Sequence, residues 1–176
     1  MLTPIEKVLT LKQVSLFHDM SINQLRILAS ISEELAFDVG DVIVNQGEYT
    51  DALFVIVQGN VEIRHYRQRT NQRRQRARTE DAMQVIAKLE PSEYFGELSI
   101  FDGEPFANEV VALEPTDVLT IHQQALHTLV AAQPTLAITL VLALSQRLRT
   151  QMNILDETVQ AKAKVIVDIF DQLENK

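Results

Sequence analysis

Residues 35–66 read LAFDVGDVIVNQGEYTDALFVIVQGNVEIRHY, a series of short apolar runs separated by glycine. Similar runs follow at MQVIAKLE (83–90), FANEVVALEP (106–115) and DVLTIH (117–122), and all five glycines of the chain fall between or beside them. Short β-rich runs bounded by turn residues are typical of antiparallel strands. Seven or eight such strands predict a β-sandwich or jelly roll over residues 35–123.

Helices are predicted on both sides of this β-region. Thr3, Pro4 and Glu6 form a capping box that opens a short helix, and Ser21 with Gln24 repeats the device. The residues expected to face the core are Val8, Leu9 and Leu11 in the first helix and Ile22, Leu25, Leu28, Ala29 and Ile31 in the second. A further helix is predicted over Gln123–Ala132, before Pro134.

From about Thr135 to Leu173 no glycine or proline interrupts the sequence, and apolar residues recur at intervals of three and four. This pattern predicts one helix of roughly 55–60 Å, which would protrude from the roll. The fold class is therefore α+β with a mainly β core: an eight-stranded jelly roll flanked by N-terminal helices and a long C-terminal helix. We expect residues 1–133 to form the roll with its helices, and residues 134–176 to form a dimerisation-type helix.

Composition limits the functions available to this chain. It has 176 residues and a net charge of −8. It has no cysteine, so thiolate metal sites and a cysteine nucleophile are excluded. No apolar run reaches the ~20 residues of a membrane span, and the N-terminus lacks a signal-peptide pattern. We expect a cytoplasmic protein without membrane insertion. No histidine and carboxylate pattern of a metal-binding roll is present, nor a Gly-x-Ser-x-Gly or Walker motif, so an enzyme is not expected.

One basic segment stands out from the acidic chain. Arg64 to Arg78 reads RHYRQRTNQRRQRAR, with seven arginines and no acidic residue. We expect Arg64 and Tyr66 to belong to the preceding strand, and the connection from Arg69 to Arg78 to be locally disordered. Docking onto an acidic surface and binding of phosphate or nucleic acid are the alternatives.

A second segment has the opposite character. Residues 95–113 read FGELSIFDGEPFANEVVAL. Backbone N–H groups around Gly96 and the carboxylate of Glu97 look suited to surround a polar ligand, yet the segment holds no lysine, arginine or histidine. Without a basic residue of its own, this segment cannot neutralise a bound anion, and this limits the ligands that it can bind.

The order of these parts, from about Leu16 to Met152, resembles the cyclic nucleotide-binding domain of catabolite-activator regulators and kinase regulatory subunits. The residues that carry the resemblance are LFHDMSINQL, the glycines at 40, 47, 59 and 96, and YFGELSIFDGEPFANEVVAL. In that family, FGEL…PRxA is the phosphate-binding cassette: backbone amides hold the anion, the glutamate accepts from the ribose 2′-hydroxyl, and the arginine neutralises the cyclic phosphate.

The resemblance implies a ligand site whose residues are Gly96, Glu97, Leu98, Ser99, Phe106 and Ala107. Phe106 stands in the arginine position, where it either fills the emptied pocket or stacks on a base, and Glu109 adds negative charge nearby. The adenine contact of the family aligns loosely with Gln151 and Met152. We therefore expect a non-enzymatic regulatory domain with weak or lost binding of cAMP or cGMP and no cofactor. The alternative is a functional sensor of a cyclic nucleotide or another small ligand in the altered pocket.

The long helix carries a heptad pattern. Its predicted seam consists of Met152, Leu155, Val159, Ile166, Ile169 and Leu173, with Lys162 breaking one row. This stripe predicts a homodimer of parallel helices, and a fold-back of Val165 to Leu173 onto the roll is the alternative. In the activator relatives a helix-turn-helix domain follows this helix, but the given sequence stops at Lys176, so direct DNA binding is not expected. A protein partner is the further candidate for this helix.

Overall fold

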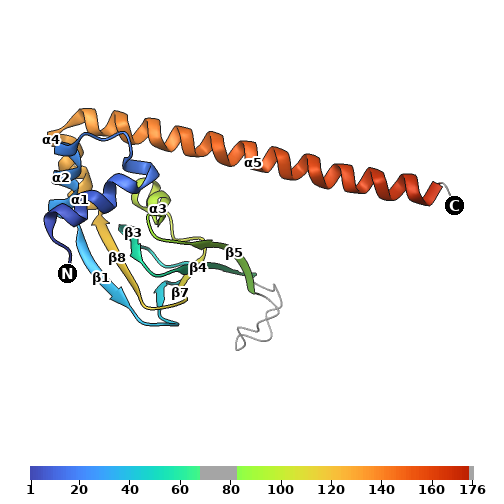
Figure 1. Ribbon diagram of the computed structural model, residues 1–176, viewed down its shortest axis with the longest axis horizontal. Helices are drawn as coiled ribbons and strands as arrows, with labels where there is room; N and C mark the ends of the chain where they lie inside the picture. The colour runs from blue at the N-terminus through green and yellow to red at the C-terminus, as the bar shows by residue number, and fades with distance from the viewer. Residues whose placement is uncertain (68–82, 175–176) are drawn as a thin grey trace.

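The computed structural model describes residues 1–67 and 83–174, and its centre is a jelly roll of two four-stranded sheets (Figure 1). The first sheet has the order β1 (Glu33–Phe37), β8 (Thr116–His122), β3 (Ala52–Gln58) and β6 (Tyr94–Phe95). The second has the order β2 (Val42–Val44), β7 (Glu109–Ala112), β4 (Val61–Tyr66) and β5 (Met83–Leu89). All strand pairs are antiparallel. The predicted eight-stranded roll is confirmed.

Strand β3 explains why one sequence run supports two hydrophobic clusters. Phe54 and Ile56 face the interior between the sheets, together with Val61, Val110 and Val118. Leu53 and Val55, which alternate with them, face the helices on the other side of the first sheet. Because successive side chains of a strand point to opposite faces, a strand covered on both faces has no polar alternation. The continuous run ALFVIV is the sequence signature of this position.

The helical layer consists of α1 (Pro4–Gln13), a 3₁₀ turn η1 (Ser15–Phe17), α2 (Ile22–Ile31), α4 (Gln123–Ala132) and the first turns of α5 (Pro134–Glu174). These elements bury a cluster against β3 and β8, and the fully buried side chains that the helical layer contributes include Leu11, Leu16, Phe17, Leu25, Leu28 and Leu136. Both predicted capping boxes are present, at Thr3 with Glu6 and at Ser21 with Gln24. The predicted N-terminal helices and the helix over Gln123–Ala132 are confirmed.

Two predicted core residues are in fact exposed. Leu9 is 59% exposed and Ile22 is 57% exposed. Residues Val8 and Leu11, three positions apart, define the packed face of α1, and Leu9 lies about 100° away from Val8 around the helix axis. Ile22 is the first residue of α2 and precedes the turns that reach the core. The predictions for these two side chains were wrong.

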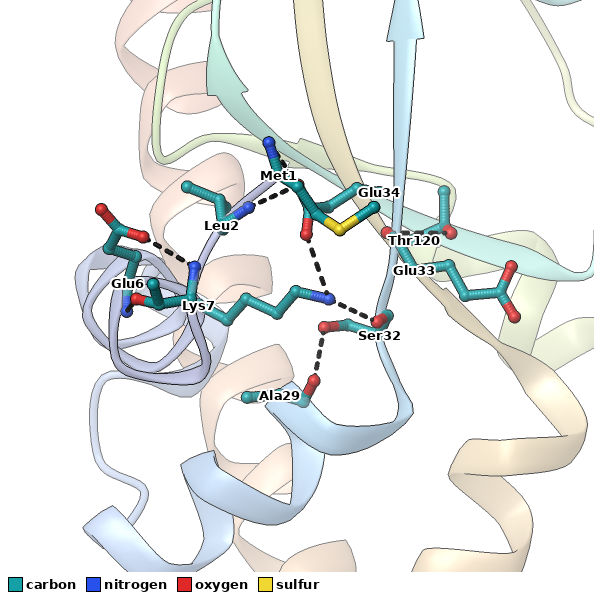
Figure 2. Close-up of polar contacts among 10 residues, drawn as sticks. Met1, Leu2, Glu6, Lys7, Ala29, Ser32, Glu33, Glu34 and Thr120 are labelled. Atoms are coloured by element: carbon teal, nitrogen blue, oxygen red, sulfur yellow. Dashed lines mark hydrogen bonds and ion pairs between the residues drawn. The ribbon is translucent and has the colours of Figure 1, made fainter.

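A polar cluster ties α1 to the start of β1. Figure 2 shows Lys7 extending from α1 so that its Nζ donates to the carbonyl oxygen of Ser32 at 2.9 Å and lies 3.4 Å from the carboxylate of Glu34. The backbone N–H of Leu2 donates to the same carboxylate at 2.7 Å, and this bond and then Lys7 lower the pKa of Glu34. These contacts fix the helical layer at one end of the first sheet.

Three short elements are absent from the sequence prediction: η1, β6 and the six-residue helix α3 (Glu97–Asp102). Helix α3 lies between Gly96 and Gly103, both in the left-handed region with φ of 89° and 72°. A left-handed residue at each end confines the helix to less than two turns, which is too short for an amphipathic pattern.

Helix α5 is a single helix of 41 residues that extends away from the roll (Figure 1). It continues without a break through residues 165–173, so the alternative fold-back of this segment is not what the structure shows. In the described part of the chain, no helix combines the length and hydropathy that crossing a bilayer requires. Arg64 and Tyr66 belong to β4 as predicted, whereas the basic connection from Arg69 to Arg78 lies outside the described residues.

Candidate functional site

Gly96 fixes the start of the candidate ligand segment against the first sheet. It follows β6, whose Phe95 pairs with Phe54 of β3, and it caps α3 with a φ of 89°. A Cβ atom at this position would lie 2.5 Å from the backbone oxygen of Ala52. Only glycine allows both the left-handed φ and this close approach to β3. Glu97 is thereby placed in the first turn of α3.

The roll contains a cavity of about 540 Å³ between this segment and the inner faces of β4 and β5. The six residues predicted for the ligand site all border it: Gly96, Glu97, Leu98, Ser99, Phe106 and Ala107. Ser99 is buried, whereas the Leu98 residue is 67% exposed and turns largely to solvent. The fold thus brings the predicted residues together around one space, and their role in binding a ligand remains a prediction.

Arg147 of α5 also borders the cavity, and sequence reasoning did not identify it. Its Nη1 lies 3.0 Å from Oε1 of Glu97, and its Cζ lies 4.3 Å from the ring centroid of Tyr94. Nη1 is buried and has no hydrogen-bond partner among the described residues, so the contact with Glu97 has the distance of an ion pair without the direction of a hydrogen bond. Arg147 therefore connects α5 to the ligand segment through charge.

A sequence signal for Arg147 does exist. It lies seven residues after Leu140 and three after Leu144, so it shares the face of α5 that packs against the helical layer. An arginine on the buried face of an amphipathic helix requires a counter-charge or an aromatic partner. Glu97 and Tyr94 are these two partners.

Phe106 forms one wall of the cavity. Its ring meets Phe95 edge-on with centroids 6.4 Å apart, and Phe95 stacks on Phe54 at 4.8 Å. Phe106 is half-buried and packs against the cluster between the sheets, yet the cavity persists beside it. The predicted filling of the pocket by this side chain is therefore partial.

The backbone of Phe106 is held by the turn over residues 45–48. Its N–H donates to the carbonyl oxygen of Glu48 at 2.8 Å, and its own carbonyl accepts from the N–H of Gly47 at 2.8 Å. Gly47 has a φ of 82°, which favours glycine at this turn. These two bonds fix the point at which the side chain of residue 106 leaves the backbone.

Glu109 is not placed beside the cavity as predicted. It begins β7 opposite Arg64 of β4, is buried, and accepts a hydrogen bond from the Tyr66 hydroxyl at 2.8 Å. Burial and then this hydrogen bond raise the pKa of Tyr66. The prediction of a negative charge beside the ligand was wrong, because β7 begins at Glu109 and directs its carboxylate towards Tyr66 of β4.

The tail of the segment is held by a histidine. Nδ1 of His65 lies 3.1 Å from Oδ1 of Asn108 and 3.3 Å from the carbonyl oxygen of Ala107. Both partners are acceptors, so Nδ1 carries the proton in this arrangement. Among the described residues, no group of three or more histidine, aspartate or glutamate side chains is arranged to hold a metal ion.

Comparison with known proteins places this geometry in a family. Residues 34–133 match the family described as the cyclic nucleotide-binding domain. A cAMP-dependent protein kinase regulatory subunit of Mycosarcoma maydis is 28% identical over 120 residues, which is 65% of this chain and 21% of that protein. A CRP-like cAMP-activated global transcriptional regulator of Mycobacterium tuberculosis is 26% identical over 149 residues, 85% of this chain and 62% of that protein.

Solved structures agree with the sequence matches. The crystal structure of a cyclic nucleotide-binding domain from Methylobacillus flagellatus superposes with a TM-score of 0.68 at 27% identity, covering 85% of this chain and 78% of that one. The chain spans about a fifth of the kinase subunit and about three fifths of the mycobacterial regulator. The matched family region includes all eight strands except the first residue of β1, together with the whole ligand segment, and the chain belongs to the cyclic nucleotide-binding domain family.

Proposed function

We propose that this chain is a non-enzymatic, cytoplasmic regulatory domain in which high-affinity binding of cyclic nucleotides has been weakened or lost. The observation that carries this proposal is Phe106. It stands in the cassette position of arginine and borders the cavity with an apolar ring, packed edge-on against Phe95. A cyclic phosphate would meet an aromatic surface at the point where a cation is required.

The expected loss follows from the electrostatics of an enclosed anion. A phosphodiester that is removed from water needs charge-assisted hydrogen bonds to replace its hydration. Without the arginine, binding weakens by about 3–5 kcal/mol, or about 10²- to 10⁴-fold in affinity.

Arg147 does not replace the missing cation in this arrangement. Its guanidinium lies beside Glu97, and one face of it covers Tyr94. A charge already neutralised by a carboxylate at 3.0 Å contributes little attraction for a second anion. The cavity therefore contains a compensated ion pair in place of a free positive charge at Arg147.

Helix α5 supports a regulatory output. The predicted seam contains two sets of residues at intervals of seven. The set with Leu155 and Ile169 continues towards the roll through the exposed residues Leu148 and Val141. The other set contains Met152 and Val159, which are also exposed. The side chains of Ile166, Ile169 and Leu173 lie outside the described residues. We propose that these two sets pair in a homodimer. Because Arg147 belongs to the same helix, occupancy of the cavity would act on the element that forms the dimer, and a protein partner could respond to it.

Titration calorimetry with cAMP and cGMP tests the binding proposal. We expect no binding tighter than about 100 μM for the unchanged chain, and a gain of about 10²- to 10⁴-fold for Phe106→Arg, which restores the cation in an otherwise intact segment. Phe106→Leu is the matched control, since it alters the ring without adding charge. Low-micromolar binding by the unchanged chain would refute the proposal and favour the alternative, a functional cyclic-nucleotide sensor.

A further inference from the structure

The cavity beside Phe106 has an apolar inner wall. The rings of Phe95 and Phe106 meet there, and Ile63, Ala87 and Leu89 continue the surface across β4 and β5. Flat rings stack on or against aromatic side chains in offset or edge-on arrangements, and aliphatic side chains complete such a surface. This end of the cavity suits a planar, uncharged ring.

The other end of the cavity is lined by two groups of opposite charge, Glu97 and Arg147, which neutralise each other. Glu97 offers acceptor oxygens. Arg147 offers a buried Nη1, 3.0 Å from one of those oxygens, that makes no hydrogen bond within the part of the chain that the structure describes. A buried donor without a partner costs free energy that a ligand acceptor would recover. A ligand with a donor beside an acceptor, such as a pair of hydroxyls or an amide edge, matches this ion pair. A ligand carrying a net charge does not.

The charged residues around the cavity also disfavour an anion. Glu93, Asp102 and Glu104 border it and are exposed, in addition to Glu97. The cations among the described lining residues are Arg147 and Lys88. Lys88 lies 3.8 Å from Glu62 and its side chain is 65% exposed. Each of these cations thus has a carboxylate within 4 Å, and the described lining residues carry more negative than positive charge.

From the aromatic wall, the neutral ion pair and the acidic opening, we propose that the cavity binds an uncharged ring compound of nucleoside type in preference to its cyclic phosphate. The ring lies against Phe106 and Phe95, and the hydroxyl or amide edge bonds to Glu97 and Arg147. A volume of about 540 Å³ is sufficient for a ligand of this size. This inference rests on the proposed loss of cyclic-phosphate binding and adds the class of ligand that takes its place.

The experiment compares matched ligands that differ only by the charged group. Adenosine with cAMP, and guanosine with cGMP, are titrated into the full chain by calorimetry and by ligand-observed NMR. We expect at least one nucleoside to bind with a Kd below about 1 mM and at least about 10-fold more tightly than its cyclic phosphate. In Phe106→Arg this preference should reverse. The ratio of two affinities in the same variant does not depend on the fraction of protein that is folded.

Variants of the ion pair locate the bound nucleoside. Arg147→Ala and Glu97→Gln should each weaken nucleoside binding about 5-fold or more, whereas Arg149→Ala, an exposed arginine of the same helix, should leave it unchanged. Circular dichroism verifies that each variant is folded. Equal effects of Arg147→Ala and Arg149→Ala would overturn the assignment of the polar end.

Two results would overturn the inference, and they can be told apart. If neither nucleoside nor cyclic nucleotide binds at about 10 mM ligand, the inference fails while the proposed loss of cyclic-nucleotide binding stands. If a cyclic nucleotide binds in the low micromolar range and more tightly than its nucleoside, both fail.

Discussion

Replacement of Gly96 by alanine should destabilise the protein more than the same replacement at Gly103, although both glycines bound α3 in the left-handed region. At Gly103 the added Cβ meets no atom of the described residues within 4 Å, so the cost is that of the backbone conformation alone, about 1 kcal/mol. At Gly96 the same cost applies, and the Cβ would also lie 2.5 Å from the backbone oxygen of Ala52 in β3.

The second cost at Gly96 can be estimated from the atoms involved. The oxygen of Ala52 belongs to a strand buried on both faces, so it cannot move aside as a flexible side chain would. Forcing extra atoms into a packed region costs about 1–3 kcal/mol. We expect Gly96→Ala to lower the free energy of unfolding by about 2–4 kcal/mol and Gly103→Ala by about 1 kcal/mol.

Urea denaturation followed by far-UV circular dichroism measures both values, provided that each variant unfolds in one transition with an unchanged m-value. Equal losses for the two variants, within about 0.5 kcal/mol, would show that the ligand segment is not pressed against β3 as described.

Two further predictions concern α5 and the N-terminal cluster. Sedimentation of the unchanged chain should give about twice the mass of one chain, and Leu148→Glu with Leu155→Glu should shift it towards one, because charges in an apolar seam are poorly solvated; a monomeric wild type at about 100 μM would contradict the pairing. Glu34 has a lowered pKa in the folded protein, so its contribution to stability is present above the unfolded pKa of about 4.3 and is lost as the pH falls through the folded pKa. Glu34→Gln should therefore be less stable than the unchanged chain at neutral pH, and the difference should shrink towards zero below about pH 4; a difference that does not change with pH would contradict this role.

The roll could be predicted because its turns need glycine. Gly59 has a φ of 83°, and a Cβ there would lie 2.5 Å from the backbone oxygen of Pro115, so the chain can turn between β3 and β4 at this point only with glycine. Such positions leave a signal in the sequence itself. Helix α3 gives no such signal in the sequence, because its six residues form less than two turns and its position depends on contacts with β3.

The candidate site was predictable only in part, because one of its charged residues, Arg147, comes from α5 and not from the ligand segment. The ligand segment, and the phenylalanine where the resemblance predicts an arginine, can be identified from neighbouring residues in the sequence. The pairing of Arg147 with Glu97 joins residues that are 50 positions apart in the sequence, and no local pattern predicts which residue Arg147 contacts. Glu109 was misplaced for a related reason: which face a strand residue takes depends on where the strand begins, and a shift of one residue reverses it.

The two backbone hydrogen bonds that join Phe106 to the turn at residues 45–48 have a consequence for how such domains diversify. Because both peptide groups of this residue are anchored by main-chain atoms, the direction of its Cα–Cβ bond is independent of the side chain it carries. A different side chain at residue 106 therefore changes the chemistry of the cavity without moving the backbone that forms its wall. A single replacement there can therefore change which ligands the cavity accepts, while the backbone of the roll keeps its form.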